Sequence, residues 1–69
     1  MSEGRIEQAM VSIRLRLDTK TLLTRSEIDD IAGEDAEIAI ARMYQSGQIA
    51  KTLAAGYEFY SLTELAREN

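Results

Sequence analysis

The chain lacks four residue types entirely: among its 69 residues there is no cysteine, histidine, proline or tryptophan. Without thiols it forms no disulfide, and without thiolate or imidazole ligands a structural zinc site is close to excluded. The absence of histidine also removes the side chain that most often acts as a general acid or base near neutral pH. No apolar run approaches the roughly 20 residues of a membrane-spanning helix.

Recognisable catalytic and targeting patterns are missing as well. The four glycines match neither a phosphate-binding loop nor a dinucleotide fingerprint, and calcium-loop spacing is absent. No serine or threonine has a base arranged as in a catalytic triad. The amino terminus lacks the basic and then apolar pattern of a signal peptide. We therefore expect no catalytic residues, no cofactor, no metal and no membrane association, and we expect a cytoplasmic location.

The residues that are present are those of an ordinary globular protein, with 45% hydrophobic and 29% charged side chains. The length predicts one domain covering residues 1–69. A chain of this size buries only about 60% of the surface that its unfolded form exposes. Its stability is therefore expected to be modest.

The charges are unevenly distributed, although the net charge is only −4. Residues 1–25 hold five basic and three acidic side chains, a net charge of +2. Residues 26–42 hold six acidic side chains and one basic, a net charge of −5, and the remainder carries −1. A basic end is thus joined to an acidic middle, and such asymmetry usually concerns partners rather than fold.

The first segment, residues 2–17, carries apolar side chains at helical intervals of three and four: Ile6, Ala9, Met10, Ile13 and Leu17. A rival interpretation exists because residues 11–17 alternate between apolar and polar, as in a half-buried strand. We favour the helix, since the upstream residues fit only the helical period. Val11 and Leu15 then point partly away from Ile13, which makes the apolar face wide.

Residues 18–21 read as a loop, and Leu22-Leu23 is long enough only for a short piece of edge strand. A second helix then begins at Thr24. Thr24 and Glu27 form a capping box, in which each side chain accepts a hydrogen bond from a backbone N–H at the helix start. Gly33 is expected to end this helix in the left-handed conformation. Its core-facing residues are Ile28, Ile31 and Ala32.

The third helix is predicted to start near Glu34 or Asp35 and to end at Gly47. Its buried stripe comprises Ala36, Ala39, Ile40 and Met43, with Tyr44 at the margin. Residues 49–54 and 57–62 then read as two strands joined by a turn at Ala55-Gly56. Thr63 is expected to cap a last helical turn over residues 64–67.

This order resembles the winged helix-turn-helix family. The residues that carry the resemblance are Leu23-Thr24-Arg25-Ser26-Glu27-Ile28, the stripe of the third helix, Gly47-Gln48-Ile49 and Tyr60-Ser61-Leu62. The resemblance implies a small α+β domain with three helices and a C-terminal β-hairpin. It also implies a transcription regulator whose third helix enters the major groove of duplex DNA and whose hairpin, the wing, lies along the backbone.

On this hypothesis we expect a dimer that contacts DNA through Arg25, Ser26, Arg42, Gln45 and Lys51. The third helix departs from a typical DNA reader, because its expected outward face is largely acidic or apolar: Glu34, Asp35, Glu37, Ile38, Ala41, Arg42 and Gln45. A typical binder makes about 6–10 phosphate contacts, and this chain has only eight basic residues. Two copies on two half-sites would supply more contacts.

The alternative hypothesis keeps the fold but replaces DNA with a protein partner. The residues that would carry it are the acidic Glu34 and Glu37 and the aromatic Tyr57 and Phe59. The carboxylates also have a purely structural explanation, since they complement the helix dipole. The aromatic side chains have one too, since they would cover the end of the first helix. A third hypothesis is that the chain is a subunit of a larger assembly.

Overall fold

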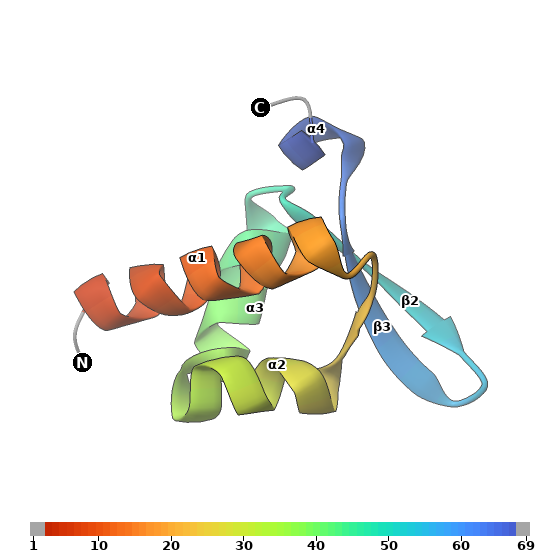
Figure 1. The fold of residues 1–69 in the computed structure, drawn as a ribbon, viewed down its shortest axis with the longest axis horizontal. Helices are drawn as coiled ribbons and strands as arrows, with labels where there is room; N and C mark the ends of the chain where they lie inside the picture. The colour runs from red at the N-terminus through yellow and green to blue at the C-terminus, as the bar shows by residue number, and fades with distance from the viewer. Residues whose placement is uncertain (1–2, 68–69) are drawn as a thin grey trace.

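The computed structural model describes residues 3–67, which form a mixed α+β fold (Figure 1). Three helices, α1 (Glu3–Thr19), α2 (Arg25–Ala32) and α3 (Ala36–Gln45), precede most of the sheet. A 3₁₀ turn, η1 (Gly33–Asp35), joins α2 to α3. The strands are β1 (Leu23–Thr24), β2 (Ile49–Ala54) and β3 (Tyr57–Leu62), and a single turn, α4 (Glu64–Arg67), follows.

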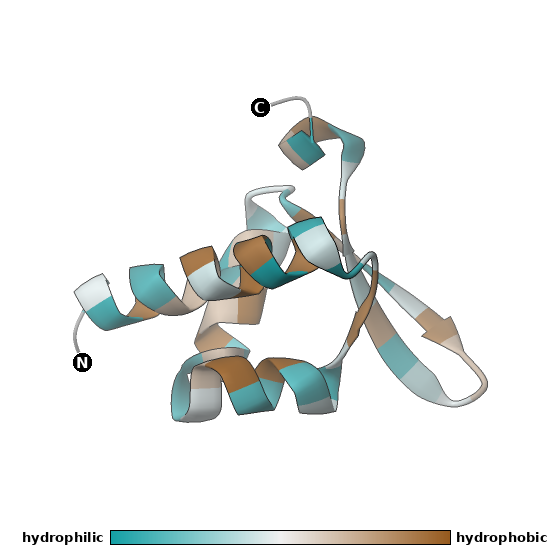
Figure 2. Ribbon diagram, in the orientation of Figure 1, coloured by the Kyte–Doolittle hydropathy of each residue, from teal (hydrophilic) through white to brown (hydrophobic). Residues whose placement is uncertain are grey.

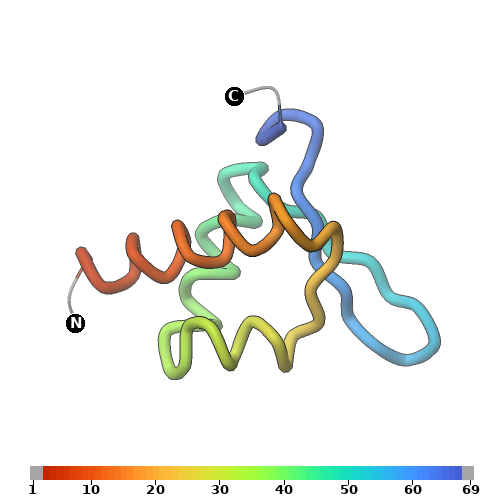
Figure 3. The backbone as a smooth tube through the Cα atoms, in the orientation of Figure 1, coloured from red at the N-terminus to blue at the C-terminus, as the bar shows by residue number. Residues whose placement is uncertain are grey.

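The sheet is antiparallel with strand order β1-β3-β2, so β3 is its central strand. The three helices gather at one end of the sheet, and the far end of the β2–β3 hairpin projects away from them (Figures 1 and 3). The hairpin is anchored at its base, where Ile49 pairs with Leu62 and both are buried. Its tip is exposed, and the end of β2 beside the turn is apolar (Figure 2).

The core lies where the apolar stripes of the helices meet the inner face of the sheet. The most deeply buried large side chains are Ile6, Ile13, Leu23, Ile28, Met43 and Ile49. The predicted stripe of α3, Ala36, Ala39, Ile40 and Met43, is confirmed as buried. Its two alanines let α1 and α2 approach α3 closely, because a methyl group leaves little to pack around.

The helical interpretation of the first segment is confirmed, and the strand alternative is wrong. Ile6, Ala9, Ile13 and Leu17 form the buried stripe of α1, whereas Val11 and Leu15 are exposed. The alternating pattern of residues 11–17 therefore has no structural counterpart. The helix extends to Thr19, two residues beyond the expected end, because the N–H of Lys20 still donates to the carbonyl of Arg16. The expected first residue, Ser2, lies outside the described residues.

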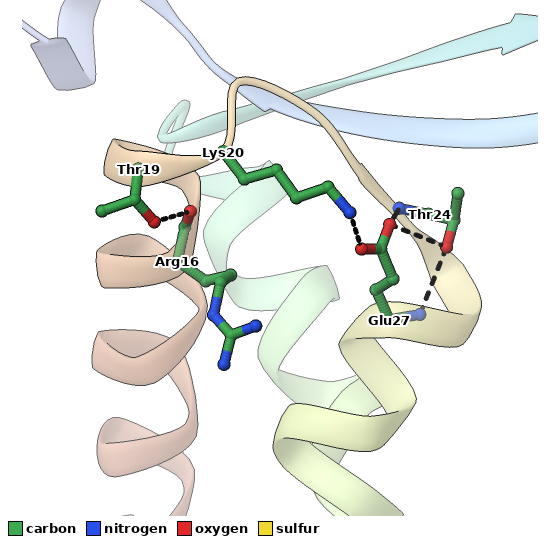
Figure 4. A network of polar contacts seen from close by, with 5 residues as sticks. All are labelled: Arg16, Thr19, Lys20, Thr24 and Glu27. Atoms are coloured by element: carbon green, nitrogen blue, oxygen red, sulfur yellow. Dashed lines mark hydrogen bonds and ion pairs between the residues drawn. The ribbon is translucent and has the colours of Figure 1, made fainter.

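The capping box of α2 is confirmed (Figure 4). The N–H of Glu27 donates to Thr24 Oγ1 at 3.2 Å, and the N–H of Thr24 donates to Glu27 Oε1 at 3.0 Å. Lys20, in the preceding loop, donates to the other oxygen of Glu27. The hydrogen bond from Lys20, followed by that from the Thr24 N–H, lowers the pKa of Glu27 to about 2.

The junction between α2 and α3 differs from expectation. Gly33 has φ 59° and ψ −131°, so φ is positive but the residue is outside the left-handed helical region. Other residues rarely adopt this conformation, which explains the glycine. The chain then makes the 3₁₀ turn, and α3 starts at Ala36, later than Glu34 or Asp35. The tighter turn rotates the Asp35 side chain inward, against the first helix.

The predicted bounds of both hairpin strands are confirmed as the sequence pattern placed them. The strands cover residues 49–54 and 57–62, and Ala55 and Gly56 both have positive φ, 52° and 80°. Such a pair is typical of a two-residue hairpin turn, whose twist matches that of the strands. Thr63 caps α4 as expected, since its Oγ1 accepts from the N–H of Ala66 at 3.2 Å.

Within residues 3–67, no helix combines the length and the apolar character needed to cross a lipid bilayer.

Candidate functional site

Helix α3 has two flanks with different surroundings, one facing α1 and one facing the sheet. On the α1 flank, Arg5 donates through Nε to Asp35 Oδ2 at 2.7 Å and through one terminal nitrogen to Asp35 Oδ1 at 3.0 Å. The same nitrogen donates to Glu34 at 2.8 Å. Arg42 makes a second two-pronged contact, donating to Glu3 at 2.6 and 3.0 Å. Two guanidinium–carboxylate pairs therefore fasten the start of α1 to η1 and α3.

Asp35 corrects one expectation from the sequence. It was placed on the outward face of the third helix, but only 7% of the residue is exposed. The hydrogen bond from Arg5 lowers the pKa of this carboxyl below its usual range, against the opposing effect of burial. Asp35 thus serves the packing of α1 and is not presented to a partner.

Arg42, predicted as a DNA contact, lies beside the start of α1. Its guanidinium pairs with Glu3, and the hydrogen bond between them lowers the pKa of Glu3. The pairing is tertiary, because α1 crosses α3 and brings a carboxylate 39 residues away in sequence to this arginine. That Arg42 contacts DNA stays a prediction.

The sheet flank of α3 is open and borders a shallow hollow of about 250 Å³. Its lining comes from the start of α2, the sheet-facing side of α3 and the strands β2 and β3: Arg25, Glu37, Ile40, Ala41, Tyr44, Lys51 and Tyr60. The hollow is smaller than the roughly 300–1,000 Å³ of a usual small-molecule pocket. Its size suits one or two side chains of a partner.

The register of the sheet explains why these strand residues meet. Lys51, Tyr60 and Leu23 are aligned across β2, β3 and β1, so they point to the same face. Leu23 and Tyr60 are buried at the core end of this row, while Lys51 at the sheet edge is exposed. The row therefore passes from the core to the rim of the hollow.

A polar chain fixes the strand side of the hollow. The hydroxyl of Tyr60 donates to Glu58 Oε1 at 3.1 Å, and Glu58 Oε2 lies 3.7 Å from the ammonium of Lys51. Burial raises the pKa of Tyr60, and the hydrogen bond to Glu58 raises it further. Tyr60 thus lines the hollow as a neutral side chain that its hydrogen bond to Glu58 holds in one orientation.

Arg25 stands at the opposite rim because it is the first residue of α2, directly after the cap. Its Nε donates to Asp29 Oδ1 at 3.0 Å, one helical turn away. Ser26, predicted beside it as a phosphate contact, is exposed in the same turn. Arg25 and Lys51, which the sequence predicted to share one surface, therefore line one hollow, and Arg42 does not line it.

The remaining predicted residues lie around this region. Gln45 is exposed at the last position of α3, and Glu34 and Glu37 are exposed as well. Glu34 pairs with Arg5, whereas Glu37 lines the hollow. Tyr57 is 66% exposed near the hairpin tip. Phe59 is half-buried on the sheet face opposite Tyr60, between Thr24 and Thr52.

The positive charges predicted to bind DNA are each paired with a carboxylate of the same molecule. All three basic residues predicted to contact DNA lie against carboxylates: Arg25 with Asp29, Arg42 with Glu3 and Lys51 with Glu58. The lining of the hollow itself holds two cations, Arg25 and Lys51, and one carboxylate, Glu37; with the partners Asp29 and Glu58 counted as well, three carboxylates stand against two cations. Across the described part of the chain, no cluster of three or more side chains could hold a metal ion.

Tyr44 is more exposed than its predicted place at the margin of the buried stripe indicates: it is 57% exposed and lines the hollow. The sequence does indicate this surface, because Glu37, Ala41 and Tyr44 follow one another at intervals of four and three, beside the buried stripe. No pattern in the sequence indicates the ion pairs on the α1 flank.

No protein-family model, no curated protein and no solved structure matches this chain.

Proposed function

We propose that this chain is a winged helix-turn-helix type of interaction module, which holds a segment of another protein in the hollow between α3 and the β2–β3 hairpin. The order of helices, sheet and hairpin supports this comparison of folds. The function is argued from the hollow itself, because one fold hosts many functions.

The observation that carries the proposal is the composition of the open flank of α3. Its floor is apolar and aromatic, from Ile40, Ala41, Tyr44 and Tyr60, and each cation at its rim already has a carboxylate partner. Tyrosine is enriched in protein interfaces because one end of the ring is apolar and the other polar. The occupant that fits is a short segment with one apolar or aromatic side chain for the floor and polar groups for the mixed rim.

Duplex DNA is the second candidate, and one observation favours it. Arg25 and Lys51 come from α2 and β2 but reach the same hollow, as expected for a surface that spans two phosphates. Exposed ion pairs are weak, typically about 0–1 kcal/mol, so phosphates would displace Asp29 and Glu58 at small cost. The small number of contacts argues against DNA, since a monomer offers only two cations here and the lining also contains the carboxylate of Glu37.

A titration followed by NMR separates the two functions. The protein is mixed at low salt with random duplex DNA, and amide shifts are followed at Arg25, Gln45 and Lys51. If the partner is a protein segment, as we propose, no salt-dependent amide shifts should appear at these residues. Salt-dependent shifts at these residues would establish DNA binding instead, because phosphate contacts release counterions.

Paired tyrosine variants test the hollow. Tyr44→Ala removes part of the lining of the hollow, whereas Tyr57→Ala removes another exposed tyrosine that does not line it. Protein captured from the native host by the wild type is expected to be lost with Tyr44→Ala and retained with Tyr57→Ala. Equal capture by both variants would contradict the proposal that the hollow is the binding site. Loss of capture with Tyr57→Ala alone would indicate that the partner binds at the hairpin tip instead. Unchanged circular dichroism checks that both variants fold.

A further inference from the structure

Strand β2 forms a free edge of the sheet. The strand order is β1-β3-β2, so within residues 3–67 no strand pairs with the side of β2 that faces away from β3. Its last four residues, from Lys51 to Ala54, are exposed in succession. The far end of the hairpin also projects away from the helices (Figures 1 and 3). An edge of this kind presents a row of backbone N–H and C=O groups, and the group that matches such a row is another extended backbone.

The two edges of the sheet differ in how they are protected. On the opposite edge, β1 has only two residues and runs directly into α2. β2 has six residues that pair with β3 without a bulge, and it contains no proline. Its only charged side chain is Lys51. Proteins usually shorten, bend or charge an edge that has to stay unpaired, so the edge of β2 is the one suited to receive a further strand.

The hairpin turn decides which backbone groups of β2 point outward. In a hairpin with a two-residue loop, the residues that flank the loop exchange hydrogen bonds, and alternate residues then do the same along the ladder. Ala54, Thr52 and Ala50 therefore bond to β3. Lys51 and Leu53 alternate with them, so the N–H and C=O groups of these two residues point to the free edge.

A second copy of β2 fits this edge best in one antiparallel register. A two-fold axis at Thr52 sets Lys51 of each copy opposite Leu53 of the other, so the outward-pointing groups of both copies pair with each other. Thr52 then faces Thr52 of the second copy, a favourable combination across strands. An axis at Lys51 would set two lysines opposite each other, which is unfavourable. An axis at Leu53 would set Lys51 opposite Ala55, which belongs to the turn.

We propose that the segment held at the hollow is β2 of a second copy of this chain, so that two three-stranded sheets join edge to edge about a two-fold axis at Thr52. This inference rests on the proposed function, whose partner it names. Lys51 and Leu53 are two positions apart and point to the same face of the sheet, the face that borders the hollow. Leu53 of the other copy therefore stands beside Lys51, at the rim of the hollow.

Leu53 has the properties that the hollow requires of its occupant. At 70% exposed, it is the most exposed large apolar side chain in the described part of the chain. The antiparallel arrangement also places the projecting tip of each hairpin beside the base of the other, where the helices gather (Figure 1). Only two residues of each strand exchange backbone hydrogen bonds across the axis, so the contact is small and the dimer is weak.

Sedimentation of the full chain, over concentrations up to about 1 mM, measures this equilibrium. Leu53→Pro removes an N–H that points to the free edge, but it leaves the bonds between β2 and β3 in place, and proline is tolerated on edge strands. It is expected to weaken dimerisation by about tenfold or more. Tyr57→Ala, on the opposite face of the hairpin, is the matched control and leaves dimerisation unchanged. A wild type that stays monomeric throughout, or a folded Leu53→Pro variant that dimerises as tightly, would overturn the proposal.

The absence of cysteine allows a direct test of the register, which does not depend on the proline variant. Thr52→Cys places one thiol of each copy at the axis, where the two Cβ atoms are close enough for a disulfide. Ala54→Cys is the matched control, because it is exposed on the same face of β2 but lies about 13 Å from its counterpart in this register. In air, Thr52→Cys is expected to form disulfide-linked dimers on non-reducing gels about tenfold faster than Ala54→Cys. Equal rates, or faster linkage through Ala54→Cys, would overturn the register.

The inference and the proposed function fail in different ways. A monomeric wild type that still loses capture of host protein with Tyr44→Ala alone would overturn the second copy as partner and leave the proposed function in place. Equal capture by Tyr44→Ala and Tyr57→Ala, together with rapid linkage of Thr52→Cys, would count against the hollow and leave the pairing of the two β2 strands in place.

Discussion

The two flanks of α3 differ in what lies against them. On the α1 flank, Arg5 and Arg42 meet Asp35 and Glu3 in two-pronged contacts, and Asp35 is buried. On the sheet flank, Glu37, Ala41 and Tyr44 are exposed and border a hollow. One flank is closed by charges from a distant part of the chain, and the other is left open.

The difference shows why a count of charges on a helix is a poor guide to its partner. The carboxylates and guanidinium groups on the closed flank pair with groups of the same molecule that lie far away in the sequence, and one of them, Asp35, is buried. What remains for a partner is decided by which neighbour crosses the helix. The open flank of α3 offers aromatic and aliphatic surface, and this is why a protein segment fits it better than a phosphate backbone.

The largest expected effect is the difference in stability between a variant in the buried stripe of α3 and a variant on its open flank. Met43→Ala removes a fully buried side chain from the central stripe of α3 and should lower the free energy of unfolding by about 2–5 kcal/mol. Tyr44→Ala, at the next position but on the open flank, should change it by about 0.5 kcal/mol or less. Urea unfolding followed by circular dichroism measures both. Similar losses for the two variants would mean that Tyr44 belongs to the core and that the flank is not open.

The next effect concerns the cap that places Arg25 at the rim of the hollow. Thr24→Ala removes the hydroxyl that accepts from the Glu27 N–H, and should cost about 1 kcal/mol of stability. Thr52→Ala, on an exposed position of β2, is the matched control and should cost less than about 0.5 kcal/mol. The same unfolding assay applies. A cost of Thr24→Ala no larger than that of the control would contradict the capping role.

The closed flank should be sensitive to acid. The pKa values of Glu3 and Asp35 are lowered in the folded state by Arg42 and Arg5, so folding favours their charged forms. Their stabilising contribution is therefore complete above the ordinary carboxyl range, about pH 4–5, and is lost as the pH falls through the lowered values. Unfolding free energies measured at neutral pH and near pH 3 should differ less in the double variant Arg5→Met, Arg42→Met than in the wild type.

Arg16→Met serves as the control for that comparison, since Arg16 lies on α1 but contacts neither carboxylate. It should retain the acid sensitivity of the wild type. If the double variant shows the full wild-type loss on acidification, the two ion pairs do not stabilise the closed flank.

The smallest effect is expected on the open flank. Asp29→Ala removes the partner of Arg25 and should change stability by only about 0.3–0.5 kcal/mol, as is usual for an exposed pair one turn apart. It also uncovers a cation at the hollow. Salt-dependent attraction to duplex DNA, which the proposed function does not expect of the wild type, should therefore increase in this variant, as measured by fluorescence anisotropy at low salt. No increase would indicate that Arg25 is not limited by its pairing with Asp29.

Most of the secondary structure could be predicted because its determinants are local. The strands at residues 49–54 and 57–62, the turn between them and the capping box at Thr24 depend on residues within a few positions of one another. Errors of a few residues arose at helix ends, where α1 continues to Thr19 and where η1 delays the start of α3. Helix ends depend on single hydrogen bonds that a periodic pattern does not encode.

The candidate site was predicted only in part. Arg25 and Lys51 line one hollow, whereas Arg42 pairs with Glu3 and Asp35 is buried against Arg5. Their partners are 39 and 30 residues away, and no pattern in the sequence records such a pairing. Tyr44 was given too small a role, because a residue at the margin of a stripe is buried or exposed according to what packs beside it.

Neighbouring residues set the order of elements, the apolar stripes, the cap and the hairpin, since each follows from local chemistry and from a helical or strand period. Packing between distant segments sets which charges pair and which side of α3 stays uncovered. These depend on how α1 crosses α3 and how the sheet register aligns Lys51 with Tyr60. The physical reason is that periodicity acts over a few residues, whereas ion pairs and hollows form between segments that only the packed core brings together.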